Sequence, residues 1–281
     1  QADRIWVLAR PDARPSIPLL PDETSPAKNF RLIDVVLIEN SNGRKISTPA
    51  EWTAAAGAAR CFHWQGVQGD DCERLARVMA GRSGGVVLSG GGARAYAHIG
   101  VIRALREKGC PIDFVGGSSM GAVIAACVAK GWDDDEIDWR IRKAFVESNP
   151  LGDYTIPVIS LVKGKRVDRR LQEHFGEDAI TDLDIPFFAV STNLTDSAVR
   201  IHTRGKLRHA LRSTISLPGI LPPFVDDGEV LVDGAVLNNF PVDIMRQTHR
   251  GFIVGCDVAR APQGLNANDF VNAPNFMGWV L

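Results

Sequence analysis

Short apolar runs rich in β-branched residues alternate with segments of helical periodicity along almost the whole chain, and this alternation restricts the fold more than any other feature. The runs that predict strands are Ile5–Ala9, Val35–Ile38, Cys61–Trp64, Val86–Leu88, Phe114–Val115, Phe187–Ser191, Val199–His202, Val230–Val232 and Phe252–Cys256. The segments that predict helices are Ala50–Ala59, Asp71–Ala80, Ala93–Lys108, Met120–Lys130, Asp134–Phe145, Val167–Phe175, Lys206–Ile215 and Val242–Gln247. The pattern favours an α/β fold in which helices sandwich a mostly parallel central sheet, and it fits neither an all-β nor an all-α architecture.

A glycine-rich stretch from Gly81 to Gly85 marks a soft boundary. Residues 1–82 are predicted to form an α/β lead-in region, and residues 83–281 the domain that carries the chemistry. The chain begins at Gln1 rather than methionine and ends on the apolar stretch Gly278 to Leu281. We therefore expect an excerpt of a longer protein, truncated at its C-terminus.

Charge and composition exclude several function classes. The formal net charge of −1 gives no reason to expect nucleic-acid binding. No apolar run approaches the roughly 20 residues that a membrane span needs. The five cysteines lack C-x-x-C spacing and lie in apolar surroundings, so we expect reduced thiols and a reducing compartment.

The first candidate motif is Gly117-Ser118-Ser119-Met120-Gly121, a G-x-S-x-G sequence between a predicted strand and a predicted helix. This is the context of a nucleophile elbow, in which Ser119 projects at a helix N-terminus that favours developing negative charge. The elbow glycines Gly117 and Gly121 permit the tight turn. The alternative is a glycine-rich connection whose serine only caps the helix.

A second motif, Gly90-Gly91-Gly92-Ala93-Arg94, also lies between a predicted strand and a helix. Consecutive glycines leave backbone N–H groups uncovered, and such donors can stabilise the oxyanion of an acyl-transfer intermediate. Arg94 is a candidate for holding a phosphate or carboxylate of the substrate.

The same segment is compatible with a dinucleotide-binding fingerprint, read as Gly90-x-Gly92-x-x-Ala95. That interpretation requires an acidic residue at the end of the next strand. Asp113 has the right distance but precedes its strand, and a nucleotide site leaves the serine motif unexplained.

A serine nucleophile needs a base. None of the six histidines has a convincing triad setting; His249 is the best of them. Asp233 is a better candidate because Leu231-Val232-Asp233-Gly234-Ala235 puts a carboxylate at the end of a short strand. An aspartate with its ordinary pKa of about 3.9 is a weak base and would need a desolvated site. The alternative is a turn aspartate in an Asp-Gly pair.

Taken together, the glycine loop, the serine elbow and the Asp-Gly-Ala segment resemble, in sequence order, the motifs of the patatin-like phospholipase family. The resemblance covers about residues 83–260 and narrows to the neuropathy target esterase branch, with its lysophospholipases. The segments that carry this narrower likeness are Leu75-Ala76-Arg77-Val78, Ala97-His98-Ile99-Gly100-Val101, Leu217-Pro218-Gly219-Ile220-Leu221-Pro222-Pro223 and Asn238-Asn239-Phe240-Pro241.

The resemblance implies a Ser–Asp dyad, no metal and no cofactor, and hydrolysis of acyl esters in lipids. Carried over, Ser119 is the nucleophile and Asp233 the base. The implied oxyanion hole comprises the loop Gly90, Gly91 and Gly92 with Arg94, aided by Met120. Ser89 and Ala95 depart from the branch, which usually has glycines flanking the loop, and this departure affects the backbone of the loop without removing a reacting group.

The expected function is therefore a serine hydrolase of phospholipids or lysophospholipids at a membrane surface, in the cytoplasm and peripheral to the membrane. Five cations form a basic cluster, namely Lys163, Lys165, Arg166, Arg169 and Arg170. The cluster is suited to binding anionic head groups, and the alternative is that it is a solvated helix face. Cyclic-nucleotide-binding domains are expected outside this chain. Two alternatives stay open, a non-catalytic nucleotide- or lipid-binding module with the same fold and a lipid transacylase.

Overall fold

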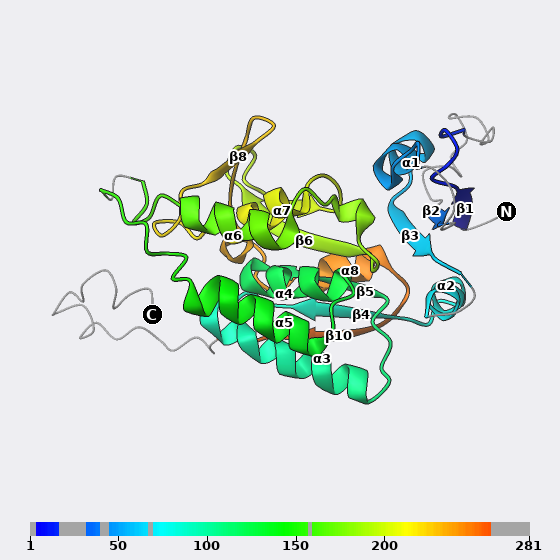
Figure 1. The fold of residues 1–281 in the computed structure, drawn as a ribbon, viewed down its shortest axis with the longest axis horizontal. Helices are drawn as coiled ribbons and strands as arrows, with labels where there is room; N and C mark the ends of the chain where they lie inside the picture. Colours follow the sequence, from blue (N-terminus) through cyan, green and yellow to red (C-terminus); the bar gives the residue numbers. More distant parts are fainter. Residues whose placement is uncertain (1–3, 17–31, 40–44, 67–69, 157–158, 260–281) are drawn as a thin grey trace.

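A seven-stranded sheet and a separate three-stranded sheet form the framework of the computed structural model, which describes residues 4–16, 32–39, 45–66, 70–156 and 159–259 (Figure 1). The strands are β1 Arg4–Ala9, β2 Leu32–Ile38, β3 Arg60–Trp64, β4 Ser83–Leu88, β5 Phe114–Ser118, β6 Phe187–Asn193, β7 Ala198–His202, β8 Phe224–Asp226, β9 Glu229–Asp233 and β10 Gly251–Cys256. The α-helices are α1 Pro49–Ala56, α2 Asp71–Met79, α3 Ala97–Glu107, α4 Ser119–Ala129, α5 Asp134–Ile141, α6 Lys165–Phe175, α7 Leu207–Thr214 and α8 Val242–Thr248. The shorter turns are the 3-10 segments η2 Gly92–Tyr96, η4 Ile180–Asp182 and η5 Gly234–Val236, and the π-type turn η3 Arg142–Glu147.

The large sheet has the strand order β10-β4-β5-β6-β9-β8, with β7 paired to β6. Strands β10, β4, β5 and β6 are parallel, whereas β7, β9 and β8 add antiparallel pairs. The expected α/β class with a mostly parallel central sheet is confirmed.

Strand β6 brings together two strands that lie far apart in the sequence. Residues 189–193 of β6 pair with β7 along one edge. On the other edge, β5 pairs with β6 up to Ser118↔Val190. From Ser191 onward β6 pairs on that edge with β9, which runs antiparallel to it and ends at Asp233↔Ser191. The C-terminal ends of β5 and β9 therefore meet on one edge of β6.

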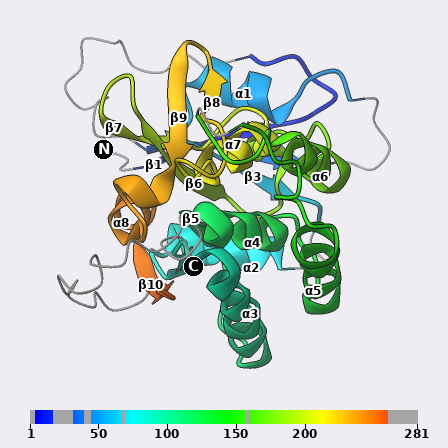
Figure 2. The ribbon, with the colours of Figure 1, turned by 90° about the vertical axis from the view of Figure 1, so that its left-hand side faces the viewer.

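Two apolar layers cover the large sheet. Helices α3 to α7 pack on the face that presents Val86, Leu88, Val115 and Ala189. The opposite face packs against α8 and α2 and also against side chains of β2 and β3. Figure 2 shows this arrangement, with α4, α5 and α6 on one side of the sheet and α8 on the other. The second face is thus covered partly by the lead-in sheet rather than by helices alone.

The parallel sheet β1-β2-β3 is joined to the rest of the molecule through Arg60 of β3, which also pairs with Asp34 of β2. Arg60 donates from Nε and Nη2 to Asp34, each at 2.7 Å, and from Nη1 to the carbonyl oxygen of Thr248 at 2.6 Å. Its guanidinium lies 5.4 Å from the ring centroid of Phe114 at the start of β5. The three-stranded sheet therefore attaches to the end of the large sheet where β5 begins (Figure 1).

Three local expectations differ from the structure. The strand expected at Val86–Leu88 begins at Ser83, so that Gly84 and Gly85 belong to β4; a Cβ on Gly85 would lie 2.3 Å from Nε2 of His249. Strand β8 was not expected. The helix predicted to reach Phe145 ends at Ile141 and continues as the π-type turn.

Two features are absent from the described residues. They contain no helix that is long and apolar enough to cross a membrane. They also contain no group of three or more His, Cys, Asp or Glu side chains arranged to hold a metal ion. The five cysteines are free thiols.

Candidate active site

Ser119 lies at the sharp turn between β5 and α4, with a positive φ of 52°. This left-handed conformation is strained for a non-glycine residue, and it is the conformation that a nucleophile elbow imposes. A Cβ on either Gly117 or Gly121 would lie 2.4 Å from the carbonyl oxygen of Leu88 in β4. The two glycines therefore let the elbow pack directly against the neighbouring strand.

Ser119 and Asp233 form a hydrogen-bonded pair, although 114 residues separate them in the sequence. The hydroxyl of Ser119 donates to Oδ2 of Asp233 at 2.7 Å, and the N–H of Ala235 donates to Oδ1 at 2.8 Å. Asp233 is 2% exposed and Ser119 is 9% exposed. Burial raises the pKa of Asp233 to about 6, although its hydrogen bonds from Ala235 and Ser119 act in the opposite direction. At neutral pH the carboxylate is thus ionised and is a stronger base than an ordinary aspartate.

The glycine loop runs beside the serine. The N–H of Gly90 donates to the carbonyl oxygen of Asn239 at 3.1 Å. No described residue accepts a backbone hydrogen bond from the N–H of Gly91, Gly92 or Met120. Those three donors, at the loop and at the N-terminus of α4, are therefore available to a ligand.

A cavity of about 610 Å³ opens in front of the serine. Ser119, Asp233, Met120, Arg94 and the three loop glycines all line it. The rest of its lining is mainly apolar and includes Tyr96, Phe145, Pro150, Leu151, Val167, Ile215, Leu217, Ile220 and Leu221. All predicted site residues except Gly117 and Gly121 thus line this one cavity. The two glycines pack the elbow against Leu88 of β4.

Two polar residues at the site were not anticipated from the sequence as site residues. Thr214, at the end of α7, accepts from the N–H of Ser119 at 2.8 Å and donates to the carbonyl oxygen of Val190. Asn239 receives the Gly90 N–H and donates from Nδ2 to the Gly90 carbonyl oxygen at 3.2 Å. The Asn238-Asn239-Phe240-Pro241 segment was the only sequence signal for Asn239, and Thr214 had none.

The structure gives no support to a histidine base. None of the six histidines, all of which lie in the described ranges, forms a hydrogen bond with Ser119 or Asp233. His249 bonds to Ser83 at the start of β4, at the opposite end of that strand from the glycine loop. His98 is buried beneath the loop and bonds from Nε2 to the Ser89 carbonyl oxygen at 2.9 Å.

Asp113, which a dinucleotide site would need, has other partners. It is fully buried, receives a 2.7 Å hydrogen bond from Arg77, and accepts from the N–H of Gly84 at 2.9 Å. Its carboxylate is therefore committed to holding α2 and β4 together and is not presented to the glycine loop.

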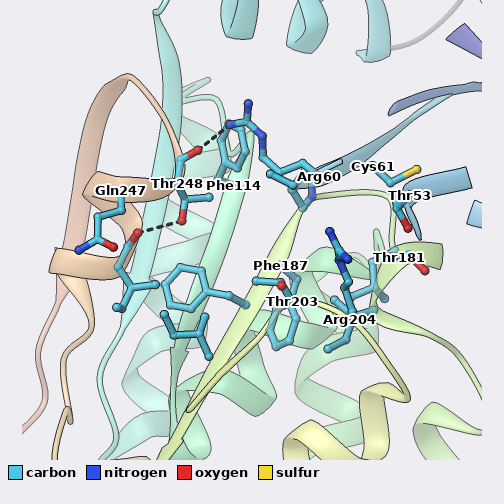
Figure 3. A pocket seen from close by; sticks show the side chains of 17 residues that line it. Thr53, Arg60, Cys61, Phe114, Thr181, Phe187, Thr203, Arg204, Gln247 and Thr248 are labelled. Atoms are coloured by element: carbon cyan, nitrogen blue, oxygen red, sulfur yellow. Dashed lines mark hydrogen bonds between the residues drawn. The ribbon is translucent and has the colours of Figure 1, made fainter. Parts of the chain in front are cut away.

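A second cavity, of about 380 Å³, lies between the lead-in region and the large sheet (Figure 3). Arg60 and Cys61 line it from one side, and Phe187, Thr203 and Arg204 from the other. Phe114 and Phe187 are the first residues of β5 and β6, so this cavity is at the opposite end of those strands from Ser119. It belongs to the junction between the two sheets and not to the candidate catalytic site.

A serine at a strand-to-helix elbow, a carboxylate partner and a glycine loop with free N–H donors define the class of layered α/β proteins suited to acyl transfer. A family profile described as "Patatin-like phospholipase" matches residues 86–246, a span that holds the glycine loop, the elbow and Asp233. The chain belongs to the patatin-like phospholipase family.

Curated relatives confirm the expected likeness to the neuropathy target esterase branch. An uncharacterised NTE family protein of Mycobacterium tuberculosis is 44% identical over 186 residues, covering 66% of this chain and 32% of the relative. The neuropathy target esterase sws of Drosophila melanogaster is 39% identical over 202 residues, or 67% of this chain and 14% of that protein. The lysophospholipase NTE1 of Yarrowia lipolytica is 39% identical over 193 residues, with the same two shares. The chain thus spans a third or less of the length of these relatives.

Among solved structures, VipD from Legionella pneumophila is similar with a TM-score of 0.43 and 16% sequence identity. The match covers 62% of this chain and 49% of VipD. The family assignment does not rest on it.

Proposed function

We propose that the chain is a serine hydrolase of phospholipid or lysophospholipid acyl esters, with Ser119 as nucleophile and Asp233 as its base. The observation that carries this proposal is the 2.7 Å hydrogen bond from the Ser119 hydroxyl to a buried carboxylate facing a largely apolar cavity. Family membership and relatives named as lysophospholipases support the same activity.

In the acylation step, Asp233 takes the hydroxyl proton as Ser119 Oγ attacks the ester carbonyl carbon. The carbonyl oxygen becomes an oxyanion, which the N–H groups of Gly91, Gly92 and Met120 stabilise. One such donor typically contributes about 3–4 kcal/mol in the transition state. Gly90 acts indirectly, because its own N–H is held by Asn239. Asp233 then returns the proton to the leaving glycerol oxygen, which leaves an acyl group on Ser119.

In the deacylation step, Asp233 accepts a proton from water, and the resulting nucleophile attacks the acyl carbon. The second oxyanion forms in the same hole and collapses by breaking the bond to Ser119 Oγ, which recovers the proton from Asp233. The products are a fatty acid and the free serine. Besides substrate and water, these proton transfers use only Ser119 and Asp233.

The lining of the cavity supports a lipid substrate. Aliphatic and aromatic side chains such as Phe145, Ile215 and Leu221 would receive the acyl chain. Arg94 is exposed beside the glycine loop, and no described carboxylate pairs with it, so we assign it to the phosphate of the head group. A lysophospholipid is the first choice because the relatives of Yarrowia lipolytica and Candida glabrata carry that name.

The wider assignments are part of the same proposal. We place the chain in the cytoplasm, peripheral to a membrane; its five free thiols suit a reducing compartment. Residues 1–82 are proposed as a lead-in region and 83–281 as the catalytic domain, with cyclic-nucleotide-binding domains outside the chain. The separate sheet β1-β2-β3 supports this division.

Labelling with a fluorophosphonate probe tests the dyad. The wild-type chain is expected to react, whereas Ser119→Ala should not react at all. Asp233→Asn should react about 10³–10⁴-fold more slowly, as when a catalytic aspartate is replaced in other serine hydrolases. Ser118→Ala is the matched control, because it removes the neighbouring, fully buried hydroxyl and should label like the wild type.

The outcomes separate the alternatives. Labelling that survives Ser119→Ala would put the nucleophile elsewhere. A folded wild-type chain that binds lysophosphatidylcholine without reacting with the probe would be a binding module. A labelled chain that moves the fatty acid to an added alcohol in preference to water would be a transacylase.

A further inference from the structure

Two short segments, Asp153–Ile156 and Ile159–Lys163, pair with each other at the mouth of the catalytic cavity. Tyr154 and Val162 form an antiparallel bridge, and backbone hydrogen bonds join Thr155 to Leu161 at 2.9 Å and Lys163 to Asp153 at 2.9 Å. We refer to the paired segments Asp153–Ile156 and Ile159–Lys163 as the mouth hairpin. In Figure 1 the chain that follows α5 (green) extends here at the left end of the molecule, opposite the lead-in strands.

The mouth hairpin is bonded to the wall of the cavity. The N–H groups of Leu161 and Val162 donate to the carbonyl oxygens of Gly219 and Ile220 at 2.9 and 3.1 Å. Ile220 lines the cavity, and Val162 is 2% exposed within the main apolar core. The base of the hairpin is therefore anchored, and its position relative to Ser119 is fixed by the fold.

The far part of the mouth hairpin presents apolar side chains to solvent. Ile156 is 81% exposed, Ile159 70% and Tyr154 67%. Leu151 and Leu217, each 40% exposed, lie both on the outside and in the cavity lining. An apolar surface thus runs from the hairpin into the cavity, and apolar patches of this kind mark interaction sites.

Positive charge borders the apolar surface. Residues 142–170 contain seven Lys and Arg against three Asp and Glu, in a chain whose net charge is −1. Within the described ranges no carboxylate pairs with Lys163, Lys165 or Arg169, whereas Asp168 is paired with Arg212. Ser148, Arg166, Arg169 and Arg170 line a small cavity of about 210 Å³. Arg170 is paired with Glu173, whereas Arg166 and Arg169 have no described carboxylate partner, and unpaired guanidinium groups beside one cavity favour a phosphate.

We propose that the mouth hairpin and the basic start of α6 dock the chain on an anionic lipid bilayer. Ile156, Ile159 and Tyr154 enter the interface, and the cations without a described carboxylate partner bind lipid phosphates: Lys163, Lys165, Arg166 and Arg169. Docking there turns the mouth of the cavity toward the membrane and lets an acyl chain pass from the bilayer to the cavity along Leu151 and Leu217. The role of this docking in catalysis rests on the proposed function. The combination of aromatic, aliphatic and basic side chains is typical of peripheral membrane contacts.

The test uses the 281-residue chain with Ser119→Ala, so that vesicles are not consumed during binding. Sedimentation is measured with vesicles of phosphatidylcholine alone and of phosphatidylcholine mixed with phosphatidylserine. The variant Lys163→Gln, Lys165→Gln and Arg169→Gln should bind the mixed vesicles about 100-fold more weakly, since each cation near an anionic surface contributes about fivefold. Its binding to phosphatidylcholine alone should not change.

The apolar contribution is tested separately. Ile156→Ser with Ile159→Ser should weaken binding to both kinds of vesicle by about tenfold or more. Two control variants carry matched changes elsewhere: Ile46→Ser with Met79→Ser, which are 52% and 71% exposed in the native chain, and the exposed cations Arg82, Lys108 and Arg250 changed to Gln. These controls should bind like the parent.

A failure of the docking proposal can be distinguished from a failure of the proposed function. Hairpin variants with an intact Ser119 should hydrolyse a water-soluble short-chain ester at the wild-type rate. Equal vesicle binding by hairpin and control variants would overturn the docking surface even if the esterase is active. Vesicle binding that depends on the hairpin in a chain without esterase activity would leave the docking surface standing and overturn the proposed function.

Discussion

Asp233 is kept in a site where its negative charge is poorly solvated, and this determines how activity depends on pH. The proposed base must be ionised to accept the Ser119 proton, and burial raises its pKa to about 6. We therefore expect kcat/KM for a neutral, soluble ester to rise tenfold per pH unit below about pH 6 and to level off above it. A pH–rate profile of the full chain checks this. A rising limb centred near pH 4 would contradict the burial argument.

The same burial makes the carboxylate costly for stability. Because the folded-state pKa of Asp233 lies above the unfolded value of 3.8, the folded state favours the protonated form. The stability that the fold gains from protonated Asp233 is fully present below about pH 4 and is lost as pH rises through about 6. Asp233→Asn should thus raise the free energy of unfolding by about 3 kcal/mol at pH 8, but not at pH 4, relative to the wild type.

Urea unfolding at both pH values measures this difference. Asp227→Asn serves as the control, because that aspartate is exposed and its replacement should have no comparable effect. A variant that gains stability while losing activity would identify the dyad as a site where function opposes stability.

At the scale of elements, α7 holds the elbow in its strained conformation through one hydroxyl. Thr214 accepts the N–H of Ser119 and donates to Val190 of β6. Thr214→Val would leave that buried N–H without a partner, at a cost of about 1–3 kcal/mol. We expect lower stability and a kcat reduced about tenfold or more with little change in KM. Thr214→Ser keeps the hydroxyl and should retain most of the activity; a large KM effect in Thr214→Val would contradict a positioning role.

The elements themselves were largely predictable, because hydrophobic periodicity is local. All the strands and helices predicted from the sequence occur, usually within a few residues of the expected bounds. Strand β8 was missed because Phe224–Asp226 is short, follows two prolines and is only partly buried. The Ser83–Gly85 part of β4 was not predicted as strand, because the side chains that require glycine there, His249 and Met245, come from a distant helix and its end.

The candidate dyad was predictable for a different reason. Ser119 and Asp233 each lie at the end of an apolar strand and within two residues of a glycine, a recognisable local signal. Thr214 and Asn239 were not predictable as site residues, since their importance comes from contacts across 95 and 149 residues of sequence. Such contacts exist only in the folded chain.

At the scale of the whole molecule, the buried Arg60 links the lead-in sheet to the catalytic part through Thr248 and Phe114, and Asp34 of the same sheet pairs with its guanidinium. Asp34→Ala would leave the Arg60 guanidinium buried without this partner, and we expect the free energy of unfolding to fall by about 3–5 kcal/mol. The double variant Asp34→Leu and Arg60→Met should recover most of that loss, which urea unfolding would show. Esterase activity at low denaturant should change little, because the pair lies at the other end of β5 from Ser119.

The meeting of β5 and β9 on one edge of β6 also sets the order in which the chain becomes reactive. During synthesis, Ser119 leaves the ribosome 114 residues before Asp233. Until β9 pairs with β6, the proposed nucleophile has no base and is an ordinary alcohol. A nascent chain would therefore pass the membranes of its own cell as an inert polypeptide, and reactivity toward their lipids would arise only once the second half of the dyad is in place.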